Sequence, residues 1–395
     1  MMKYHMEYLV FSSTRFRFYM WSLLPSWLQS AFMVYRAIGL MSGSSLDGLD
    51  IVFTALHENR GEWNFEILAA DCYPYSEEWQ QRLKNATELS ARDYQLLHAD
   101  YGHYIGREVN RFIEAHNLHY QVGLIASHGH TTFHLPGQKM TAQLGDGAAI
   151  AATTRLPVVS DLRALDVAFG GQGAPIVPIG EKLLLNEYAL LLNLGGIANI
   201  SFKQSDRYVA FDICAANRVL NMLVGQLGKA YDDGGQVAKA GTLHEGLLQQ
   251  LNELAYYRLP YPKSLANSFG TDEVYPIIER AGLPVEDALR TYVEHIAVQI
   301  TASIANETFE EGSHKLLVTG GGAFNTFLIQ RMQELLSPYG IEVVVPDEKL
   351  VQYKEALVMA LIGVLRWRQE YNVLSSVTGA ERDSIGGAVW IGQEA

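Results

Sequence analysis

The chain carries 43 acidic and 30 basic residues among its 395, and the resulting net charge of −13 argues against a nucleic-acid-binding surface. Its length and its 48% of hydrophobic residues allow two domains, each with a core of its own. Only two cysteines occur, Cys72 and Cys214, and their spacing forms neither a metal-ligand pair nor a disulfide framework. This sparing use of cysteine favours a reducing, cytoplasmic location.

The start of the chain differs from the rest. Residues 18–35 carry no charge, are rich in aromatic residues and follow two arginines, so a signal peptide or membrane anchor must be considered. Pro25 and several polar residues weaken that interpretation. A start codon assigned too early explains the segment equally well, because Met33 directly precedes the first apolar run, and a packed or loose arm is a third alternative. We expect residues 1–33 to be an extension that the fold does not need, without stable membrane association.

A turn rich in serine and glycine separates two apolar runs. The first run covers residues 35–41 and the second begins at Leu49, a pattern that predicts strand, turn and strand. Gly43 and Gly48 permit unusual backbone torsions, and the hydroxyls and amides between them can converge on a phosphate. Asp47 adds a carboxylate through which a magnesium ion can be held. An ordinary solvated hairpin turn is the alternative.

A meander and then helices are predicted next. The pattern alternates up to Cys72, with a turn at residues 60–61, and so extends the first hairpin. Helical spacing takes over at residues 76–117, where residues 90–93 resemble a capping box. The first part of the chain therefore combines a sheet with helices.

Three histidines follow the next predicted strand. Residues 121–127 read as a short buried strand, and His128, His130 and His134 stand in the loop at its end, where open α/β sheets bind ligands. Their spacing invites a zinc site, but the loop offers no further ligand and a glycine-containing turn does not hold histidines on one face. Neutral imidazoles that hydrogen-bond a polar ligand are the favoured use, and imidazoles that satisfy the loop backbone are the alternative.

Two carboxylates stand beside a glycine-rich loop in the middle of the chain. A predicted strand at residues 156–160 is followed by Asp161 and Asp166, and then by Gly-Gly-Gln-Gly at residues 170–173. A general base needs such a carboxylate, near an opening and poorly solvated, and the glycines allow close approach to a ligand. The alternative is a surface ion pair between Asp161 and Arg163 beside a plain turn.

The second half of the chain again shows predicted strands that lead into glycine-rich turns. Residues 188–202 predict strand, glycine turn and strand, and residues 316–325 predict a strand, three glycines and a helix start that can approach a nucleotide. No Walker A motif is present, and no Gly-x-Gly-x-x-Gly opens a helix, so phosphates would have to be held by the Ser/Gly hairpins. The sequence therefore predicts an α/β protein of the actin, sugar kinase and Hsp70 type, with two lobes that close over ATP.

Residues 42–48, Ser-Gly-Ser-Ser-Leu-Asp-Gly, resemble the first phosphate loop of the anhydro-N-acetylmuramic acid kinases, where Ser-Gly-Thr-Ser-Leu-Asp-Gly is usual. Residues 161–175 match that family's Asp-x-Arg-x-x-Asp-Val-Ala-x-Gly-Gly-Gln-Gly-Ala-Pro, a block long enough to be specific. The resemblance covers about residues 34–392. Further stretches similar to family motifs are residues 127–131, 193–199, 319–325 and 377–382.

The chain departs from the family pattern at three places. Where Phe-Asp-Thr-Gly-Pro-Gly-Asn is usual, residues 211–217 keep Asp212 and Asn217 but lose the glycines between them. This loss changes the backbone freedom beside the expected nucleotide. His130 replaces a glutamine, and Ser44 replaces a threonine while keeping the hydroxyl.

The resemblance implies an ATP-dependent kinase of peptidoglycan recycling. Members open 1,6-anhydro-N-acetylmuramic acid with water and phosphorylate its 6-oxygen, which gives N-acetylmuramic acid 6-phosphate. It implies ATP and Mg²⁺, with Asp166 as the general base and Asp47 and Asp212 as metal ligands. The implied substrate-binding residues are His128, His130, Gln172 and Glu355. The implied ATP-binding residues are Gly43, Ser44, Ser45, Leu46, Asp47, Gly48, Leu49, Asp50, Gly195, Gly196, Asn199, Gly320, Gly321 and Gly322.

Further expectations concern Glu355 and the two lobes. Glu355 precedes an apolar helix at residues 356–360, where an acid is favoured at a helix N-terminus. Residues 34–165 with about 376–395 are expected to form lobe I, which carries the first phosphate loop, and residues 166–375 to form lobe II.

Two other functions stay open at this point. One is a kinase of another small sugar or acid in the same superfamily, and the other is a nucleotide-driven binding module that transfers no phosphate. A chaperone-like module has no need of an acid beside a Gly-Gly-Gln-Gly loop, so the Asp166 block favours the kinase. A homodimer is one expected assembly.

Overall fold

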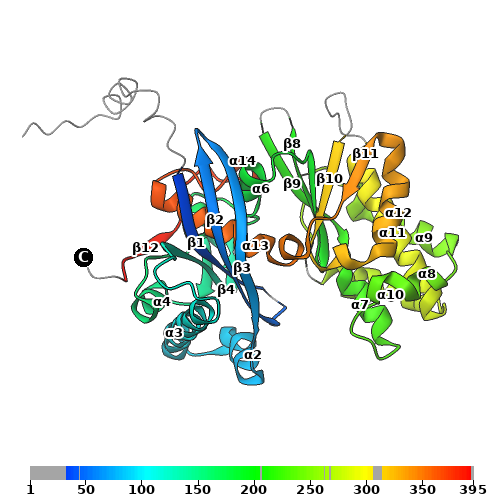
Figure 1. Cartoon of the computed structure of the whole chain (residues 1–395). Coiled ribbons are helices and arrows are strands. Elements are labelled where there is room, and N and C mark those ends of the chain that lie inside the picture. The colour runs from blue at the N-terminus through cyan, green and yellow to red at the C-terminus, as the bar shows by residue number, and fades with distance from the viewer. Residues whose placement is uncertain are drawn as a thin grey trace, which may run out of the picture.

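The computed structural model describes residues 33–43, 45–204, 207–261, 263–266, 268–305 and 314–392, and the N-terminal extension lies outside these ranges. Two mixed β-sheets lie side by side, and helices cover them to form two lobes (Figure 1). The two-lobed α/β fold predicted from the sequence is confirmed.

The first sheet has seven strands in the order β12-β6-β4-β1-β2-β3, and β5 pairs with β4. Its strands are β1 (Met33–Ser42), β2 (Gly48–Asn59), β3 (Glu62–Pro74), β4 (Leu124–Leu135), β5 (Met140–Leu144), β6 (Val158–Ser160) and β12 (Ala388–Trp390). The first three strands form the predicted antiparallel meander, whereas β4 runs parallel to β1 and β6 runs parallel to β4.

The second sheet repeats this arrangement with five strands in the order β11-β10-β7-β8-β9. Its strands are β7 (Leu190–Leu194), β8 (Ile197–Gln204), β9 (Arg207–Ala215), β10 (His314–Thr319) and β11 (Ile341–Val344). An antiparallel meander again comes first, and β10 then runs parallel to β7. Each lobe therefore has a glycine hairpin at an equivalent place, between β1 and β2 in one and between β7 and β8 in the other. Such a repeat is typical of the actin-like ATPase fold.

Helices cover both sheets. Those of the first half are α2 (Glu77–Lys84), α3 (Ala91–Ala115), α4 (Gly147–Thr154), α5 (Ala164–Ala168) and α6 (Pro178–Leu184). Those of the second half are α7 (Asn217–Gly225), α8 (Gln236–Ala240), α9 (Glu245–Asn252), α10 (Tyr275–Arg280), α11 (Val285–Ala305), α12 (Thr326–Leu336), α13 (Glu348–Arg368) and α14 (Ser375–Thr378). The Ser90 hydroxyl accepts the Asp93 N–H at 3.2 Å, so the cap predicted for α3 is confirmed. Among the described helices, none has the length and apolar character that crossing a membrane requires.

Helix α13 lies between the two sheets (Figure 1). Its buried apolar residues share one core with Leu124 and Val159 of the first sheet and with Leu191 and Leu317 of the second. Full burial of such a side chain stabilises the fold by ~1.5–3 kcal/mol. Through this shared core, α13 forms an apolar connection between the lobes.

A buried ion pair lies in the same junction. The Lys354 ammonium of α13 donates to Glu181 Oε1 of α6 at 2.7 Å, and the two residues are 4% and 5% exposed. The hydroxyl of Ser201, on β8 of the second sheet, donates to Glu181 Oε2. Three elements that are distant in sequence are therefore joined through one carboxylate.

The fold corrects one expectation, about the three histidines, and bears on another, about the lobe that contains α13. Because β4 continues to Leu135 and pairs with β5, His128, His130 and His134 belong to a strand and not to a loop. Helix α13 packs against β1, β2 and β4 although residues 348–368 fall within the range expected for lobe II. The lobe boundaries stay a prediction, and these contacts favour placing α13 with lobe I.

Candidate active site

The turn between β1 and β2 is held by its own aspartate. Asp47 Oδ1 accepts hydrogen bonds from the Ser45 hydroxyl at 2.7 Å and from the Gly48 N–H at 3.0 Å. Leu46 has a positive φ of 58°, and its N–H reaches the Gly43 carbonyl at 3.4 Å. The turn is therefore tight, and the Asp47 side chain is exposed at its surface.

Other residues of this stretch have different surroundings. Leu49 is 1% exposed and lies in the core, so only its backbone can contribute to binding, and Ser44 lies outside the described residues. Asp50 is half-buried on β2. Burial raises the pKa of Asp50 to about 6, and the nearby charges of Asp47 and Glu355 add to the rise. The charges of Asp47 and Glu355, from two distant segments, therefore both act on Asp50.

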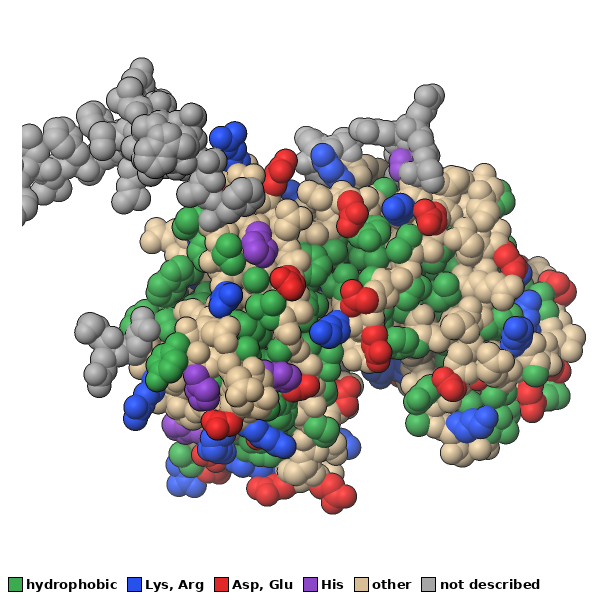
Figure 2. Space-filling view, viewed as in Figure 1, with side chains coloured by type: hydrophobic (Ala, Val, Ile, Leu, Met, Phe, Trp, Pro, Cys, Tyr) green, Lys and Arg blue, Asp and Glu red, His purple; other side chains and the backbone are tan. Residues whose placement is uncertain are grey.

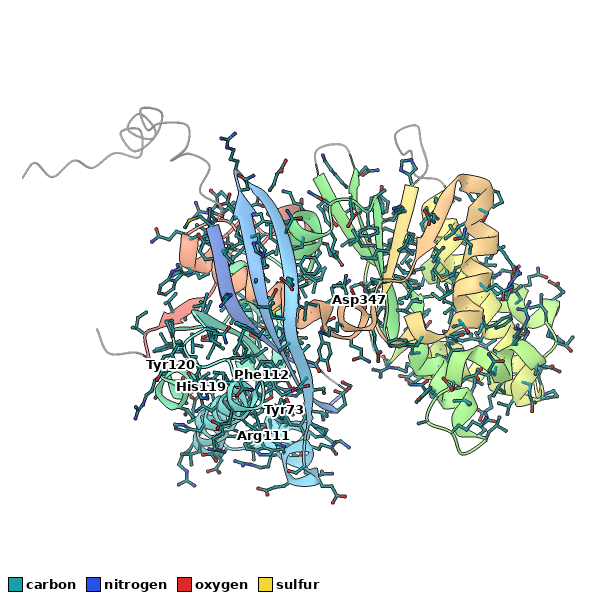
Figure 3. The ribbon with its side chains drawn as sticks, in the orientation of Figure 1. Tyr73, Arg111, Phe112, His119, Tyr120 and Asp347 are labelled. Atoms are coloured by element: carbon teal, nitrogen blue, oxygen red, sulfur yellow. The ribbon has the colours of Figure 1, made fainter. Side chains whose placement is uncertain are left out.

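Glycine allows α13 to lie directly against β1. A Cβ placed on Gly39 would come within 1.8 Å of the Ala356 carbonyl oxygen, so no other residue fits there. This contact brings Glu355 close to the end of β1. Glu355 lies in the middle of α13, so the expected position at a helix N-terminus is wrong. The helix is capped by Asp347, which accepts the Leu350 N–H at 2.9 Å and lies between the two sheets (Figure 3).

His130 bonds to the strand that enters the phosphate turn. Its Nδ1 lies 3.1 Å from the Ser42 hydroxyl, which accepts a hydrogen bond from the Tyr75 hydroxyl at 2.8 Å. Because Ser42 already accepts from Tyr75, its own proton can be donated to His130 Nδ1. Burial lowers the pKa of His130, which favours the neutral imidazole that accepts this bond.

His128 is bonded to Arg163. The Arg163 Nε–H donates to His128 Nε2 at 2.8 Å, and Arg163 Nη1 donates to the Gly173 carbonyl at 2.6 Å. The other imidazole nitrogen, Nδ1, donates to the Gly129 carbonyl at 2.8 Å. Burial lowers the pKa of His128 to about 3, and the Arg163 charge adds to the effect. His128 is therefore a neutral acceptor that fixes the plane of the guanidinium.

The ion pair considered between Asp161 and Arg163 is not formed in the described structure. Asp161 is exposed, and its Oδ2 accepts the Ser160 hydroxyl at 2.8 Å. Burial lowers the pKa of Arg163 to about 10, while the charges of Glu355 and Asp166 act in the opposite direction. The charges of both carboxylates, one on α13 and one on α5, therefore act on Arg163.

Asp166 is fully buried, and both of its carboxylate oxygens are bonded. Oδ2 accepts the Gly173 N–H at 2.8 Å, and Oδ1 accepts the Thr378 hydroxyl at 2.7 Å. A Cβ on Gly171 would lie 2.2 Å from Asp166 Oδ2, so glycine is required where the loop wraps the carboxylate. Gln172 is exposed, and its N–H donates to the Thr378 carbonyl at 2.8 Å. The loop therefore encloses Asp166 and leaves Gln172 outside.

Four polar residues stand in one row across the second sheet. The register pairs Thr319 with Asn193, Asn193 with Asn199, and Asn199 with Asp212, so their side chains share one face. Asp212 Oδ2 accepts the Leu265 N–H at 2.8 Å, and burial raises the pKa of Asp212. Asp212 therefore lies on a different sheet from the first phosphate turn.

The turn between β7 and β8 is closed by the start of α7. The Ala216 N–H donates to the Gly196 carbonyl at 2.8 Å, and the Asn217 N–H donates to the Gly195 carbonyl at 3.1 Å. Ala216 is buried with a φ of −130°, so the stretch that lost its glycines requires no left-handed backbone at this residue. The altered stretch instead continues β9 up to Ala215.

A cavity of about 500 Å³ lies beside the third glycine turn, residues 320–322. Gly320 has a φ of 81°, and a Cβ on Gly322 would lie 2.6 Å from Leu194 Cβ, so the turn approaches the end of β7 closely. The volume is in the range of small-molecule sites. Residues that line the cavity include Asn217, Tyr231, Asp232, Gly321, Phe324 and Gln352.

The structure places Asp47, Asp50, Arg163 and Asp166 on or beside the first sheet, and Glu355 on the junction helix α13. The predicted glycines of the second lobe lie at two neighbouring turns, and a notch separates the lobes on the face shown in Figure 2. Sequence reasoning gave no role to Thr378 or to the two aromatic residues of the cavity. Tyr231 and Phe324 had a readable signal, since each is an aromatic residue within three positions of a double or triple glycine.

Comparison with known proteins identifies the family. A family model described as anhydro-N-acetylmuramic acid kinase matches residues 35–392. The kinase of that name from Francisella tularensis subsp. novicida is 32% identical over 375 residues, which cover 89% of this chain and 97% of that protein. The one from Vibrio cholerae serotype O1 is 33% identical over 368 residues, with the same two shares of 89% and 97%.

Solved structures give only distant matches. An activator of 2-hydroxyisocaproyl-CoA dehydratase from Clostridium difficile is 14% identical with a TM-score of 0.39, and the match covers 85% of this chain and 96% of that one. A ROK family glucokinase from Streptomyces griseus is 12% identical with a TM-score of 0.38, covering 83% and 99%. These low scores add nothing to the topology described above. By the family model and the curated relatives, the chain belongs to the anhydro-N-acetylmuramic acid kinase family.

Proposed function

We infer that the chain is an ATP-dependent kinase that opens 1,6-anhydro-N-acetylmuramic acid with water and phosphorylates its 6-oxygen, a step of peptidoglycan recycling. The observation that carries this inference is the enclosure of Asp166 by the Gly171–Gly173 loop, beside Arg163 and Glu355. A carboxylate in such a dry, fixed position suits proton transfer.

Asp166 is proposed as the general base of ring opening. It accepts a proton from water, the water oxygen bonds to the anomeric carbon, and the bond from that carbon to the 6-oxygen breaks. The freed 6-oxygen then attacks the γ-phosphorus of ATP, and ADP leaves. A carboxylate offers about four acceptor sites, and the two hydrogen bonds to Asp166 leave acceptor sites for a water. Because Asp166 is fully buried, the glycine loop must shift when the sugar binds.

The sugar is proposed to bind between the Asp166 loop and α13. Glu355 from α13 and the exposed Gln172 from the loop are placed to contact it from two sides. His128 is proposed to act through Arg163, since its imidazole is already bonded to that guanidinium. His130 is proposed to support the end of β1 through Ser42.

ATP is proposed to lie with its base in the 500 Å³ cavity and its phosphates over the three glycine turns. Mg²⁺ would supply charge neutralisation of the phosphates, and carboxylate oxygens are the protein ligands that it prefers. Asp47 fits this group because its side chain is exposed on the phosphate turn, and the half-buried Asp50, whose pKa is raised mainly by burial, lies on the strand that leaves this turn. Asp212 is a weaker fit, since it is half-buried on β9 of the second sheet and not exposed on the phosphate turn.

Location and assembly are also proposals. Both cysteines are free thiols in the described structure, which supports a reducing, cytoplasmic location. A homodimer is the assembly that we propose. We place residues 348–368 with lobe I because α13 packs on the first sheet.

The test is coupled ADP release from ATP with and without 1,6-anhydro-N-acetylmuramic acid. The proposed function predicts ADP formation that depends on the anhydro sugar and is not stimulated by glucose. Turnover that is independent of any sugar would instead favour a nucleotide-driven binding module, and stimulation by a different sugar would favour another kinase of the superfamily.

A further inference from the structure

An arginine stands over the glycine turn of the second sheet. The three atoms nearest to a Cβ placed on Gly196 all belong to Arg218: Nε at 3.7 Å, Cβ at 3.8 Å and Nη2 at 3.9 Å. Gly196 is exposed and Arg218 is half-buried. The guanidinium therefore reaches the open side of the turn between β7 and β8.

The backbone fixes this position. Arg218 is the second residue of α7, and the two preceding residues, Ala216 and Asn217, donate their N–H groups to the Gly196 and Gly195 carbonyls. On its other side, Arg218 Cδ lies 3.9 Å from the place of a Cβ on Gly270. The stem of Arg218 therefore passes between two glycines, which leave room for it on both sides.

The same helix links this turn to the cavity. Asn217, Leu220 and Asn221 of α7 line the 500 Å³ cavity, and Asn217 Nδ2 lies 3.8 Å from the place of a Cβ on Gly321. The cavity, the turn at residues 320–322, the β7–β8 turn and Arg218 therefore follow one another along α7. A nucleotide with its base in the cavity would extend its phosphates over these turns and present the last one to Arg218.

Charge adds a second argument. The three glycine-turn stretches, residues 39–53, 193–202 and 319–325, contain no lysine or arginine. Phosphoryl transfer depends on positive groups at the transferred phosphate, and the planar guanidinium suits phosphate oxygens.

We propose that Arg218 binds the terminal phosphate of ATP and stabilises the phosphoryl group during its transfer. This inference rests on the proposed function, since it assumes that ATP is the donor. Arg218 would then be a catalytic residue of the second lobe. It would supply the positive charge that the glycine turns of this lobe lack.

Binding provides a test that does not need the sugar. Arg218→Ala should weaken a non-hydrolysable ATP analogue by about tenfold or more while changing ADP affinity by less than about twofold, because only the analogue carries the third phosphate. Arg280→Ala, at an exposed residue of α10 in the same lobe, removes the same charge and should change neither affinity. Equal weakening of ADP and analogue, or no weakening of either, would overturn the proposal.

Kinetics and rescue give the second readout. Sugar-dependent turnover should fall by ~10²-fold or more in Arg218→Ala, as for other groups that stabilise developing charge. Arg218→Lys should recover part of it, and so should millimolar guanidinium added to the alanine variant. Loss of turnover without any rescue would contradict the proposal. Wild-type protein that forms no phosphorylated sugar would count against the proposed function, while the binding comparison would still decide the role of Arg218.

Discussion

The two glycine hairpins occupy equivalent places in the two sheets but present different chemistry. The turn between β1 and β2 carries side-chain groups of its own, with Asp47 fixed by Ser45 and Gly48 and with Asp50 close by. The turn between β7 and β8 is bare glycine, closed by backbone bonds from α7. The first hairpin therefore offers oxygen ligands, and the second offers a glycine backbone without side chains and the space beside it.

This difference gives the lobes separate tasks around one nucleotide. Carboxylates of the first lobe suit a cation and a proton, whereas the second lobe holds the cavity and the neighbouring glycine turns. Helix α13 and its buried ion pair connect the two. Variants on one side should therefore change chemistry or metal use, and variants at the junction should change stability.

The largest effect is expected at Asp166. Asp166→Asn should reduce sugar phosphorylation by ~10²–10⁴-fold, because the amide keeps the shape but cannot accept the proton. The fold should persist, since the amide oxygen can accept the Gly173 N–H and the Thr378 hydroxyl can accept from the amide nitrogen. Steady-state turnover with a thermal melt measures both.

Asp161→Asn is the matched control for that variant. Asp161 is exposed, bonds only locally to Ser160 and has a φ of 56°, a conformation that asparagine tolerates well. Its turnover should stay near that of the wild type. If Asp161→Asn were the inactive variant and Asp166→Asn the active one, the assignment of the general base to Asp166 and its glycine loop would be wrong.

The junction should respond in stability. Lys354→Met leaves Glu181 charged and buried without its partner, which should cost ~3–5 kcal/mol in the free energy of unfolding measured in urea. Lys182→Met, at an exposed residue of the same α6 helix, should cost little. Adding Glu181→Leu to Lys354→Met should recover much of the loss. If the double variant had the same free energy of unfolding as Lys354→Met alone, the ion pair between Lys354 and Glu181 would not be what stabilises the junction.

Asp47 tests the metal side of the comparison. Asp47→Ala should lower turnover at saturating magnesium by about tenfold or more, in line with losing one charge-positioning group, and should leave the melting temperature nearly unchanged. Asp100→Ala, an exposed acid of α3, serves as the control. An unchanged rate for Asp47→Ala would move the metal to the second lobe, with Asp212 as the next residue to test.

Acid should weaken the second lobe through His295. This imidazole is fully buried, with Asn252 Oδ1 at 2.7 Å from Nδ1 and the Tyr257 hydroxyl at 3.0 Å from Nε2. Burial lowers its pKa to about 3, below the value near 6.5 of the unfolded chain, so its neutral form stabilises the fold above pH 6.5. That contribution is lost as pH falls, by ~2 kcal/mol at pH 5.

Urea unfolding at pH 5 and pH 7.5 measures this dependence. His295→Gln keeps polar groups at the site but does not titrate, so its stability should change less between the two pH values. The exposed His103 gives the control variant His103→Gln, which should keep the wild-type slope. If the free energy of unfolding changed equally with pH in the wild type and both variants, His295 would not be the cause of the pH dependence.

The smallest effect is expected at Glu355. Glu355→Gln should raise the KM for the sugar by about two- to tenfold, the range of one hydrogen bond, while the KM for ATP stays nearly unchanged. Capping cannot explain a change, because Asp347 caps α13. Equal increases in the KM for the sugar and the KM for ATP would show that Glu355 affects the binding of both substrates and does not contact the sugar alone.

Local rules predicted much of the fold. Glycine and serine turns between apolar runs gave both hairpins, and the cap at Ser90 followed from its neighbour three residues on. The start of α13 was also readable, since Asp347 follows a proline and precedes Glu348, but the apolar run after Glu355 drew attention away from it. The strand over the histidines was not readable locally, because β4 is extended by pairing with β5.

The sequence indicated which types of residue form the candidate site, but it did not indicate which of them contact one another. A pair between Arg163 and Asp161, its near neighbour in sequence, was the alternative considered, but Arg163 bonds to His128, which is 35 positions away. Thr378 lies 212 positions from Asp166. Tertiary contacts of this kind decide between equally plausible local pairings, and one sequence contains no spacing rule for them.

The most direct test of the central claim is mass spectrometry of the product formed from ATP and 1,6-anhydro-N-acetylmuramic acid in heavy-oxygen water. We predict a sugar that has gained one phosphoryl group and one molecule of heavy water at early times, before exchange labels a preformed product kept in the same solvent. Asp166→Asn should form neither product nor label. A phosphorylated sugar with its anhydro ring intact, or labelled product from Asp166→Asn at the wild-type rate, would contradict the account.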